Sequence, residues 1–446
     1  MTRTSSGPSA GGRPSWTAVA LFLLCAVVYS ANGREISSAD TLPTRLIPVS
    51  LIEDLRLDLD RFVQSSMPRL HEYSVQHVRG HYMSSYPIVA ALLAVPIYAL
   101  PIMLLGASSL ALINLLAKVT ATVIAAGSVV FVFLAARRLA DEGAALGVSL
   151  VYALATSTWS VSSQGLWQHG PAQLFMALAV YLALSGEGRV LAHVGSVVGL
   201  AVGLMVAARP PTAIVGMTLI GYVAYRSRRE GGKSILFCLA ALLLTMAYNV
   251  WYFGSLEGGY AQINATHQLR HAVQGTWSTP LMQGLGGLLF SPSRGLFIYS
   301  PVLLFALAGI VHAFREPRGA PLQWLAVAWV ASLLVMSKYS VWWGGHSFGP
   351  RLLADFLPVA ALLLVPALNR AERSRTARGL FLGLYGLSVV VQIIGAFFYP
   401  SPRAVDWNPT PQDVDMVHGR LWDWGDTQLL RLLRNGPRAF GFGEGE

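Results

Sequence analysis

The acid Asp40 lies a few residues beyond the first apolar run of the chain, WTAVALFLLCAVVYSA (residues 16–31). A carboxylate held close to a reacting hydroxyl or amine can accept its proton as a new bond forms. The same side chain also has a structural use, because an Asp before Thr41 and Pro43 could cap the free backbone N–H groups of a helix that begins there. The position of Asp40 therefore indicates either a proton acceptor or a helix cap.

Basic side chains recur at the ends of other apolar runs, where they could bind a phosphate group at a membrane surface. Guanidinium groups keep their charge and offer paired donors to phosphate oxygens. Arg351 follows GGHSFGP, whose glycines let the backbone approach a ligand, although it could instead pair with Asp355 one helical turn later. The basic residues at such ends are Arg209, Arg294, Lys338 and Arg351.

The remaining acids of the first loop fall in EDLRLDLDR (residues 53–61). Leu51, Leu55 and Leu59 recur every four residues, and the charges fill the positions between them. This spacing predicts an amphipathic helix with one solvated face. We therefore interpret the acids of this segment as surface charges and not as a metal-binding motif.

The composition excludes a water-soluble protein, because 54% of the 446 residues are hydrophobic and only 12% are charged. We expect an all-α polytopic membrane protein. The net charge of +10 comes from Lys and Arg between apolar runs, where such residues set the orientation of the spans. The basicity is thus explained by topology, and we expect no nucleic-acid partner.

The loop charges favour about eleven transmembrane helices. If every apolar run crossed, basic segments such as RSRREGG (226–232) and EGR (187–189) would face outward, against the positive-inside rule. The run 86–105 contains three prolines, so we interpret it as a helix that does not span. The resulting division is a cytoplasmic tail 1–15, a transmembrane domain 16–399 with outer loops 32–108, 162–170, 254–295 and 338–351, and an extracytoplasmic cap 400–446.

Several motifs, together with an acid just past the first span, carry a resemblance over nearly the whole chain. They are LWQHGP (166–171), YFGSLEGGY (252–260), WWGGHSFGPRLLADFLP (342–358) and RLWDWGDTQLLR (420–431). The chain resembles the GT-C superfamily of membrane glycosyltransferases, and in particular a bacterial branch related to protein mannosyltransferases. The resemblance implies a GT-C-like fold with outer-face loop helices in the bacterial cytoplasmic membrane. It also implies transfer of a sugar from a polyprenyl-phosphate carrier to an extracytoplasmic glycan, lipid or protein.

The resemblance also implies roles for individual residues. Asp40 would be the catalytic base, since the catalytic acid of GT-C enzymes occupies this place in the first outer loop. The loop SSQGLWQHGP lacks the acid pair with which metal-dependent members bind an ion, so the sequence predicts a monophosphate donor and no metal. The residues expected at the donor phosphate or sugar are Arg351, Arg209, Arg294, His169, His346 and Lys338. Trp342, Tyr260 and Glu257 are expected at the acceptor or sugar.

Two other classes of function stay open at this point. A transporter or flippase of lipid-linked sugars would need a polar path through the bilayer, and Lys118 is the one Lys or Arg deep in an apolar run. A noncatalytic partner protein would keep the fold and lack the chemistry. His169 could also be an ordinary interfacial histidine, and Trp342 could belong to an interfacial aromatic belt.

Overall fold

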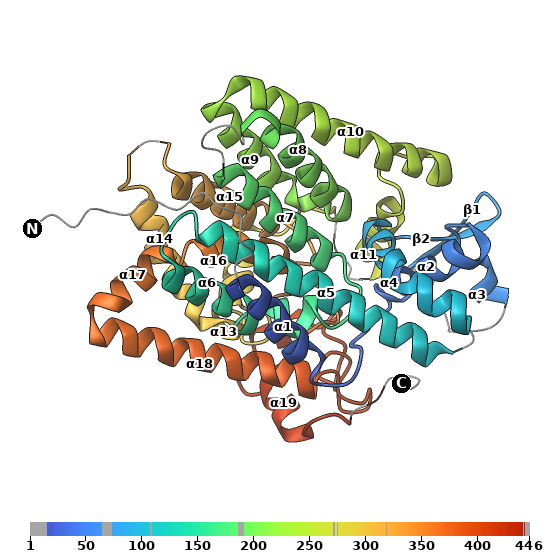
Figure 1. The fold of residues 1–446 in the computed structure, drawn as a ribbon. Helices are drawn as coiled ribbons and strands as arrows, with labels where there is room; N and C mark the ends of the chain where they lie inside the picture. The colour runs from blue at the N-terminus through green and yellow to red at the C-terminus, as the bar shows by residue number, and fades with distance from the viewer. Residues whose placement is uncertain are drawn as a thin grey trace, which may run out of the picture.

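The computed structural model describes residues 16–64, 74–107, 109–185, 191–270, 273, 275–317, 319–439 and 441. The predicted tail 1–15 and the basic segment EGR (187–189) lie outside these residues. The described chain is mostly helical, as the composition predicts (Figure 1).

The helices of the first half are α1 (Trp16–Ser30), α2 (Leu42–Asp54), α3 (Asp60–Gln64), α4 (Val89–Leu105), α5 (Leu110–Ala136), α6 (Glu142–Leu154), α7 (His169–Leu184), α8 (Leu191–Ala208), α9 (Ala213–Arg226) and α10 (Arg228–Phe253). Those of the second half are α11 (Tyr260–Arg270), α12 (Leu281–Phe290), α13 (Leu296–Tyr299), α14 (Leu304–Ala313), α15 (Pro321–Met336), α16 (Leu357–Leu362), α17 (Val365–Arg373), α18 (Arg375–Phe398) and α19 (Gln428–Asn435). A π-helical turn covers Thr158–Ser162, and short 3-10 turns cover Pro210–Thr212, Pro301–Leu303, Arg351–Phe356 and His418–Trp422.

The prediction of an all-α chain misses one β-hairpin in the connection 32–108. Strands β1 (Val75–Val78) and β2 (His81–Ser84) pair antiparallel, with Val75 opposite Ser84. The connecting residues Arg79 and Gly80 both have positive φ, 52° and 85°, which suits a two-residue hairpin turn. The strands are four residues long, too short for their alternation to stand out in the sequence.

The amphipathic helix predicted over Leu51–Leu59 is also wrong. Helix α2 ends at Asp54, because Leu55 adopts the left-handed conformation with φ 55°. Arg56 then donates to Asp58 at 2.7 Å and to Asp60 at 3.0 Å, which closes the chain into a turn. Leu59 packs inward and is completely buried. The leucine spacing thus reflects a turn that returns to the core and not one continuous helical face.

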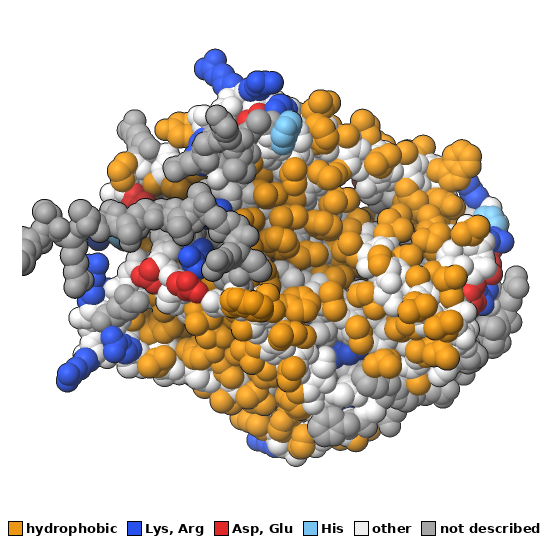
Figure 2. Space-filling view, in the orientation of Figure 1, with side chains coloured by type: hydrophobic (Ala, Val, Ile, Leu, Met, Phe, Trp, Pro, Cys, Tyr) orange, Lys and Arg blue, Asp and Glu red, His pale blue; other side chains and the backbone are white. Residues whose placement is uncertain are grey.

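Three helices among the described residues, α5, α10 and α18, are long and apolar enough to cross a membrane. A bent pair formed by residues 351–362 and 365–371 would make a fourth span, and shorter apolar helices accompany them. In the view of Figure 2, hydrophobic side chains cover the middle of the face, and Lys, Arg, Asp and Glu gather mainly toward its two ends. These features indicate a membrane protein, whereas the number of eleven spans stays a prediction.

The long helices differ in how deeply they lie in the protein. Helix α5 crosses the centre and packs against α1, α6 and α7, and 67% of its apolar stretch is buried. Helix α10 lies along one edge, and only 17% of its apolar stretch is buried (Figure 1). The rest of this apolar stretch consists mainly of leucines and other apolar side chains that face outward. Helix α10 therefore forms a surface suited to contact with lipid.

A row of glycines lets α8 pack closely on α10. Gly195, Gly199 and Gly203 are spaced four residues apart, and a β-carbon at any of them would clash with α10. At Gly195 and Gly199 the clash would be with the carbonyl oxygens of Glu230 and Ser234. Small residues at this spacing bring the backbones of membrane helices together. The row thus fixes α10 along α8, where both helices border the cavity described next.

Candidate active site

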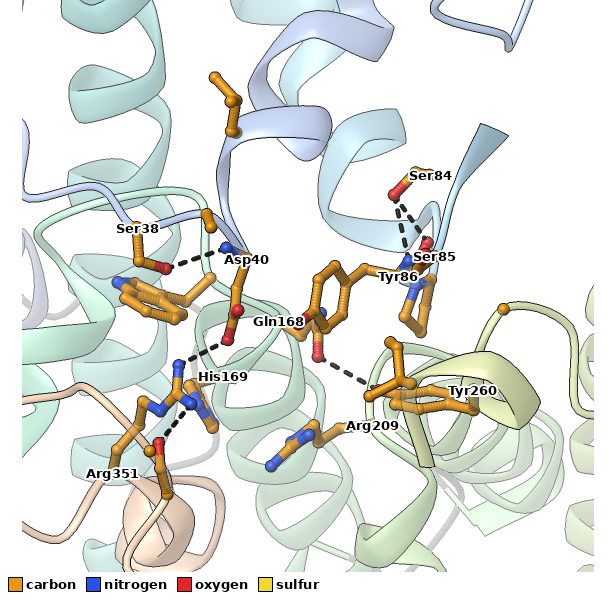
Figure 3. A pocket seen from close by; sticks show the side chains of 18 of the residues that line it. Ser38, Asp40, Ser84, Ser85, Tyr86, Gln168, His169, Arg209, Tyr260 and Arg351 are labelled. Carbon is orange, nitrogen blue, oxygen red and sulfur yellow. Dashed lines mark hydrogen bonds and ion pairs between the residues drawn. The ribbon is translucent and has the colours of Figure 1, made fainter. Parts of the chain in front are cut away.

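A cavity of about 2230 Å³ opens where several of the long connections between helices meet. Its walls come from the loop between α1 and α2, the hairpin exit at residues 84–88, the start of α7, the ends of α8 and α10, helix α11, the loop 344–351 and the cap. Segments far apart in the sequence therefore share one space, whose central side chains are shown in Figure 3.

Asp40 lies in this cavity and does not cap a helix. The cap of α2 is Thr41, which makes no side-chain cap bond. The Asp40 backbone N–H donates to Ser38 Oγ at 3.1 Å, which helps to hold the turn. The carboxylate Oδ2 accepts from Arg351 Nη1 at 2.7 Å (Figure 3). The helix-cap interpretation of Asp40 is therefore wrong.

Arg351 is fixed by three contacts at the start of its 3-10 turn. Besides Asp40, its Nη2 donates to the carbonyl of Gly344 at 2.7 Å, and its guanidinium lies 4.7 Å above the Trp167 ring. Gly344 has φ 75°, a conformation that favours glycine. This turn brings its carbonyl back to Arg351. The alternative pairing of Arg351 with Asp355 is not formed.

Asp355 instead joins two other predicted site residues. This completely buried carboxylate contacts His169 Nδ1 at 2.7 Å and accepts from Arg209 Nε at 3.0 Å. Both partners line the cavity. Asp355 thus fixes the imidazole and the guanidinium in place. The sequence contained a signal for this role, since an acid inside the apolar run LLADFLP needs partners.

Tyr260, the first residue of α11, lies next to the group formed by Asp355, His169 and Arg209. Its hydroxyl donates to Gln168 Oε1 at 3.2 Å, and the ring lies beside Arg209 in Figure 3. Burial raises the pKa of the Tyr260 phenol, while Arg209 acts in the opposite direction. Glu257 is exposed and lines the cavity farther along the same loop.

Lys118 is a buried residue of α5 that does not line the cavity. Its Nζ donates to Gln164 Oε1 at 2.6 Å and to the carbonyl of Ser163 at 3.2 Å. Asn32, at the start of the Asp40 loop, donates to the same Gln164 oxygen at 2.7 Å. Lys118 therefore supports the loop before His169, and Gln164 of that loop accepts from both Lys118 and Asn32.

A second buried contact supports the Asp40 loop. Arg45 of α2 donates to Glu35 at 2.6 Å, and both side chains are buried. Burial raises the pKa of the Glu35 carboxyl, and Arg45 lowers it. This ion pair connects the chain that leaves α1 to α2, on either side of Asp40.

Three predicted site residues do not line the cavity. Arg294 is completely buried, and its guanidinium donates to the oxygens of Trp343, Ser293, Gln428, Gly345 and Asn408. Trp342 packs against Gly287 and Trp422 inside the protein. Lys338 follows α15, outside the cavity wall. Arg294 and Trp342 therefore have packing roles in the structure. The sequence could not show this, because a residue at the end of a loop can turn inward as easily as toward a ligand.

The arrangement of helices is similar to that of an archaeal oligosaccharyltransferase, a membrane glycosyltransferase with the GT-C fold. Two crystal structures of the Archaeoglobus fulgidus oligosaccharyltransferase have a similar fold. One, tethered with an acceptor peptide containing the NVT sequon, has a TM-score of 0.54 and 12% identity, covering 86% of this chain and 55% of its own. The other, in complex with Zn and sulfate, has a TM-score of 0.51 and 12% identity, covering 94% and 58%. This chain therefore spans little more than half the length of those proteins.

Comparison of the amino-acid sequence with known families and proteins finds no match. No family model matches the chain, and no curated protein matches it. The fold is thus assigned through structure alone.

The prediction that no metal takes part has to be corrected. It rested on the acid-free loop SSQGLWQHGP. Among the described residues, however, two groups of possible ligands form elsewhere, Asp58 with Asp60 and His81, and His346 with Asp413 and Asp415. One of the two similar crystal structures is itself a complex with Zn. Residues His346, Asp413 and Asp415 line the cavity, so they are the ones that could hold an ion there. An ion at this place would add positive charge to the cavity wall.

Proposed function

We propose that this protein is an inverting glycosyltransferase that moves a sugar from a polyprenyl-phosphate carrier to an extracytoplasmic acceptor. The observation that carries the proposal is the contact between Asp40 and Arg351, two residues 311 positions apart that meet in one cavity. Arg209 and His169 lie in the same cavity, fixed by Asp355. The GT-C fold supports this class of reaction.

The proposed step is a single displacement. A hydroxyl or amine of the acceptor attacks the anomeric carbon from the face opposite the phosphate, and the bond from that carbon to the phosphate oxygen breaks. The acceptor proton passes to the Asp40 carboxylate, and the bonding electrons leave with the carrier phosphate. Arg351 and Arg209 would stabilise the charge that develops on that phosphate. The configuration of the sugar is thereby inverted.

The ion pair between Asp40 and Arg351 suggests an order of binding. A carboxylate beside a guanidinium is a weaker base than a carboxylate alone, because the positive charge favours its ionised form. The phosphate of a donor would compete with Asp40 for the donors of Arg351. Asp40 would then become the stronger base only when the donor is in place, which limits wasteful activity at an empty site.

The apolar side of the cavity suits a prenyl chain. Helices α8 and α10 contribute Val206, Leu242 and Met246 to its wall, and the neighbouring Leu243 and Leu244 face outward on α10. A carrier could therefore place its phosphate near Arg351 while its chain lies along the edge that α10 offers to lipid. This flank supports a lipid-linked donor over a water-soluble one.

The transporter alternative loses its supporting residue. Lys118 does not line the cavity, and its ammonium group is bonded to Gln164 and Ser163. A buried amine that donates to a neighbouring loop is explained without a path for substrate.

The function can be tested with the purified protein in detergent. The protein would be mixed with a panel of prenyl-phosphate hexoses and pentoses and with extracted cell-envelope glycans and lipids. Release of prenyl phosphate and the mass of the products would be followed by mass spectrometry. We expect release with at least one donor, and release at background level in the Asp40→Asn variant. If no donor in the panel is consumed and a deletion strain keeps all its surface glycans, the proposal is wrong.

We further propose that the cavity faces the outside of a bacterial cytoplasmic membrane. The proposal is supported by the basic loops that the sequence places on the opposite side. Reporter fusions after Ala107 and after Arg434 should both give an extracytoplasmic signal. A cytoplasmic signal from either fusion would contradict this topology.

A further inference from the structure

We propose that His346, Asp413 and Asp415 form a binding site for a divalent transition-metal ion, such as zinc, at the edge of the cavity. His346 Nε2 lies 2.8 Å from Asp413 Oδ1 and 3.6 Å from Asp415 Oδ2. The possible ligand atoms all lie within 4.8 Å of one another. They come from two separate segments, the loop 344–350 and the cap.

The two carboxylates are held by outer hydrogen bonds of the kind that orient metal ligands. The indole N–H of Trp343 donates to Asp415 Oδ1 at 2.8 Å, which directs Oδ2 toward His346. The backbone N–H of Asp415 donates to Asp413 Oδ1 at 2.9 Å. Only 5% of the Asp415 side chain is exposed. Such outer contacts fix the direction of a ligand before an ion arrives.

The charge around the site favours a cation. Two guanidinium groups interact electrostatically with these acids, Arg294 with Asp415 and Arg420 with Asp413. The N–H groups of Arg294 nevertheless donate to neutral oxygens, those of Trp343, Ser293, Gln428, Gly345 and Asn408. Those of Arg420 donate to the backbone carbonyls of Asn408, Gln412 and Thr410. The hydrogen bonds of Arg294 are thus used to tie the cap to the loops. Two carboxylates that converge on one imidazole therefore suit a doubly charged ion.

The second group of possible ligands provides a useful contrast. Asp58, Asp60 and His81 all contact one guanidinium, that of Arg56, at 2.7, 3.0 and 2.9 Å. A positive charge already occupies the centre of that group, and its members do not line the cavity. The His346 group is therefore the better candidate.

The ligand types indicate which ions would bind. One imidazole nitrogen with two carboxylate oxygens suits zinc and related transition metals. Magnesium and calcium prefer sites made of oxygen alone. An ion here would join the cap to the loop whose Gly344 carbonyl accepts from Arg351 at 2.7 Å. Metal binding would thus stabilise the loop that positions Arg351.

The test measures zinc binding without any substrate, so its result does not depend on the proposed reaction. The full-length protein in detergent would be stripped with a chelator, dialysed and titrated with zinc chloride in a calorimeter, and its melting temperature would be recorded with and without zinc. We expect about one zinc per chain and a rise in melting temperature. His346→Gln and Asp413→Asn should each weaken zinc binding by at least roughly 10-fold.

The matched control is Asp60→Asn, which alters the other group and should bind zinc as the unmodified chain does. Unchanged melting temperatures of the zinc-free variants would show that they are folded. Asp413→Asn is the milder change, since a third of this side chain is exposed and its remaining oxygen can still accept the backbone bond. The proposal is overturned if the stripped protein binds no zinc, if His346→Gln and Asp413→Asn bind it normally, or if Asp60→Asn abolishes binding.

Discussion

Replacing Asp40 by Asn separates proton acceptance from the other contacts of this side chain. The carboxamide oxygen can still accept from Arg351 Nη1, which now lies 2.7 Å from the carboxylate, and Arg351 keeps its bond to Gly344. We therefore expect the variant to fold and to bind donor, with a loss of about 1 kcal/mol in the free energy of unfolding. Loss of the base should lower turnover by roughly 100-fold or more, equivalent to about 2.7 kcal/mol of transition-state stabilisation.

The assay is the rate of prenyl-phosphate release at saturating donor, compared with the affinity for the same donor in the absence of acceptor. Asp54→Asn is the matched control, because Asp54 belongs to the same connection 32–108 but ends helix α2 and does not line the cavity. It is 40% exposed and pairs with Arg61 on the surface. This control should turn over normally. Near-normal turnover by Asp40→Asn would refute the role of Asp40 as base, and an equal fall in Asp54→Asn would show that the loss comes from the loop as a whole.

Three further changes test other parts of the structure. Arg351→Lys keeps the charge but cannot reach Asp40 and Gly344 with paired donors, so donor affinity measured by calorimetry should fall by roughly 10-fold or more. Arg294→Met removes hydrogen bonds to five neutral acceptors, of which Gln428 Oε1 keeps those from Tyr299 and Gly349. Chemical denaturation should show a loss of roughly 2–4 kcal/mol in the free energy of unfolding, and an unchanged stability would mean that the cap is held by other contacts. Gly199→Val forces α8 and α10 apart and should lower the melting temperature, whereas Gly232→Ala, which meets nothing within 4 Å, should not.

The sequence was most informative about features that depend on contrast with the apolar runs, namely the helical membrane architecture and the polar residues at the ends of those runs. Composition and loop charges sufficed for a helical membrane protein, and the quoted motifs for a GT-C fold, which the structural similarity confirms. Asp40, Arg351, Arg209 and His169 could be selected because a charged group at the end of an apolar run needs a reason to be there. The structure brings these four into one cavity.

The sequence was least informative about the direction in which a loop side chain points. Arg294 and Arg351 both follow loop glycine, serine or proline residues, yet one turns into the protein and the other into the cavity. Only long-range contacts decide this, such as the bond from Arg294 to Asn408 at 2.6 Å. The proposed metal site was missed for the same reason, although His346 was expected at the donor. His346 and Asp413 lie 67 positions apart, and neither segment alone resembles a metal motif.

The distance in sequence between Asp40 and Arg351 has a consequence for the synthesis and assembly of the protein. During synthesis Asp40 is made early, and Arg351 follows only after 311 further residues. A partly inserted chain therefore contains Asp40 without Arg351. It lacks the phosphate contact of Arg351 and cannot catalyse the proposed transfer. Activity would switch on in one step, when the late helices dock against the early ones. Two co-expressed fragments divided between these residues should accordingly be silent alone and active together.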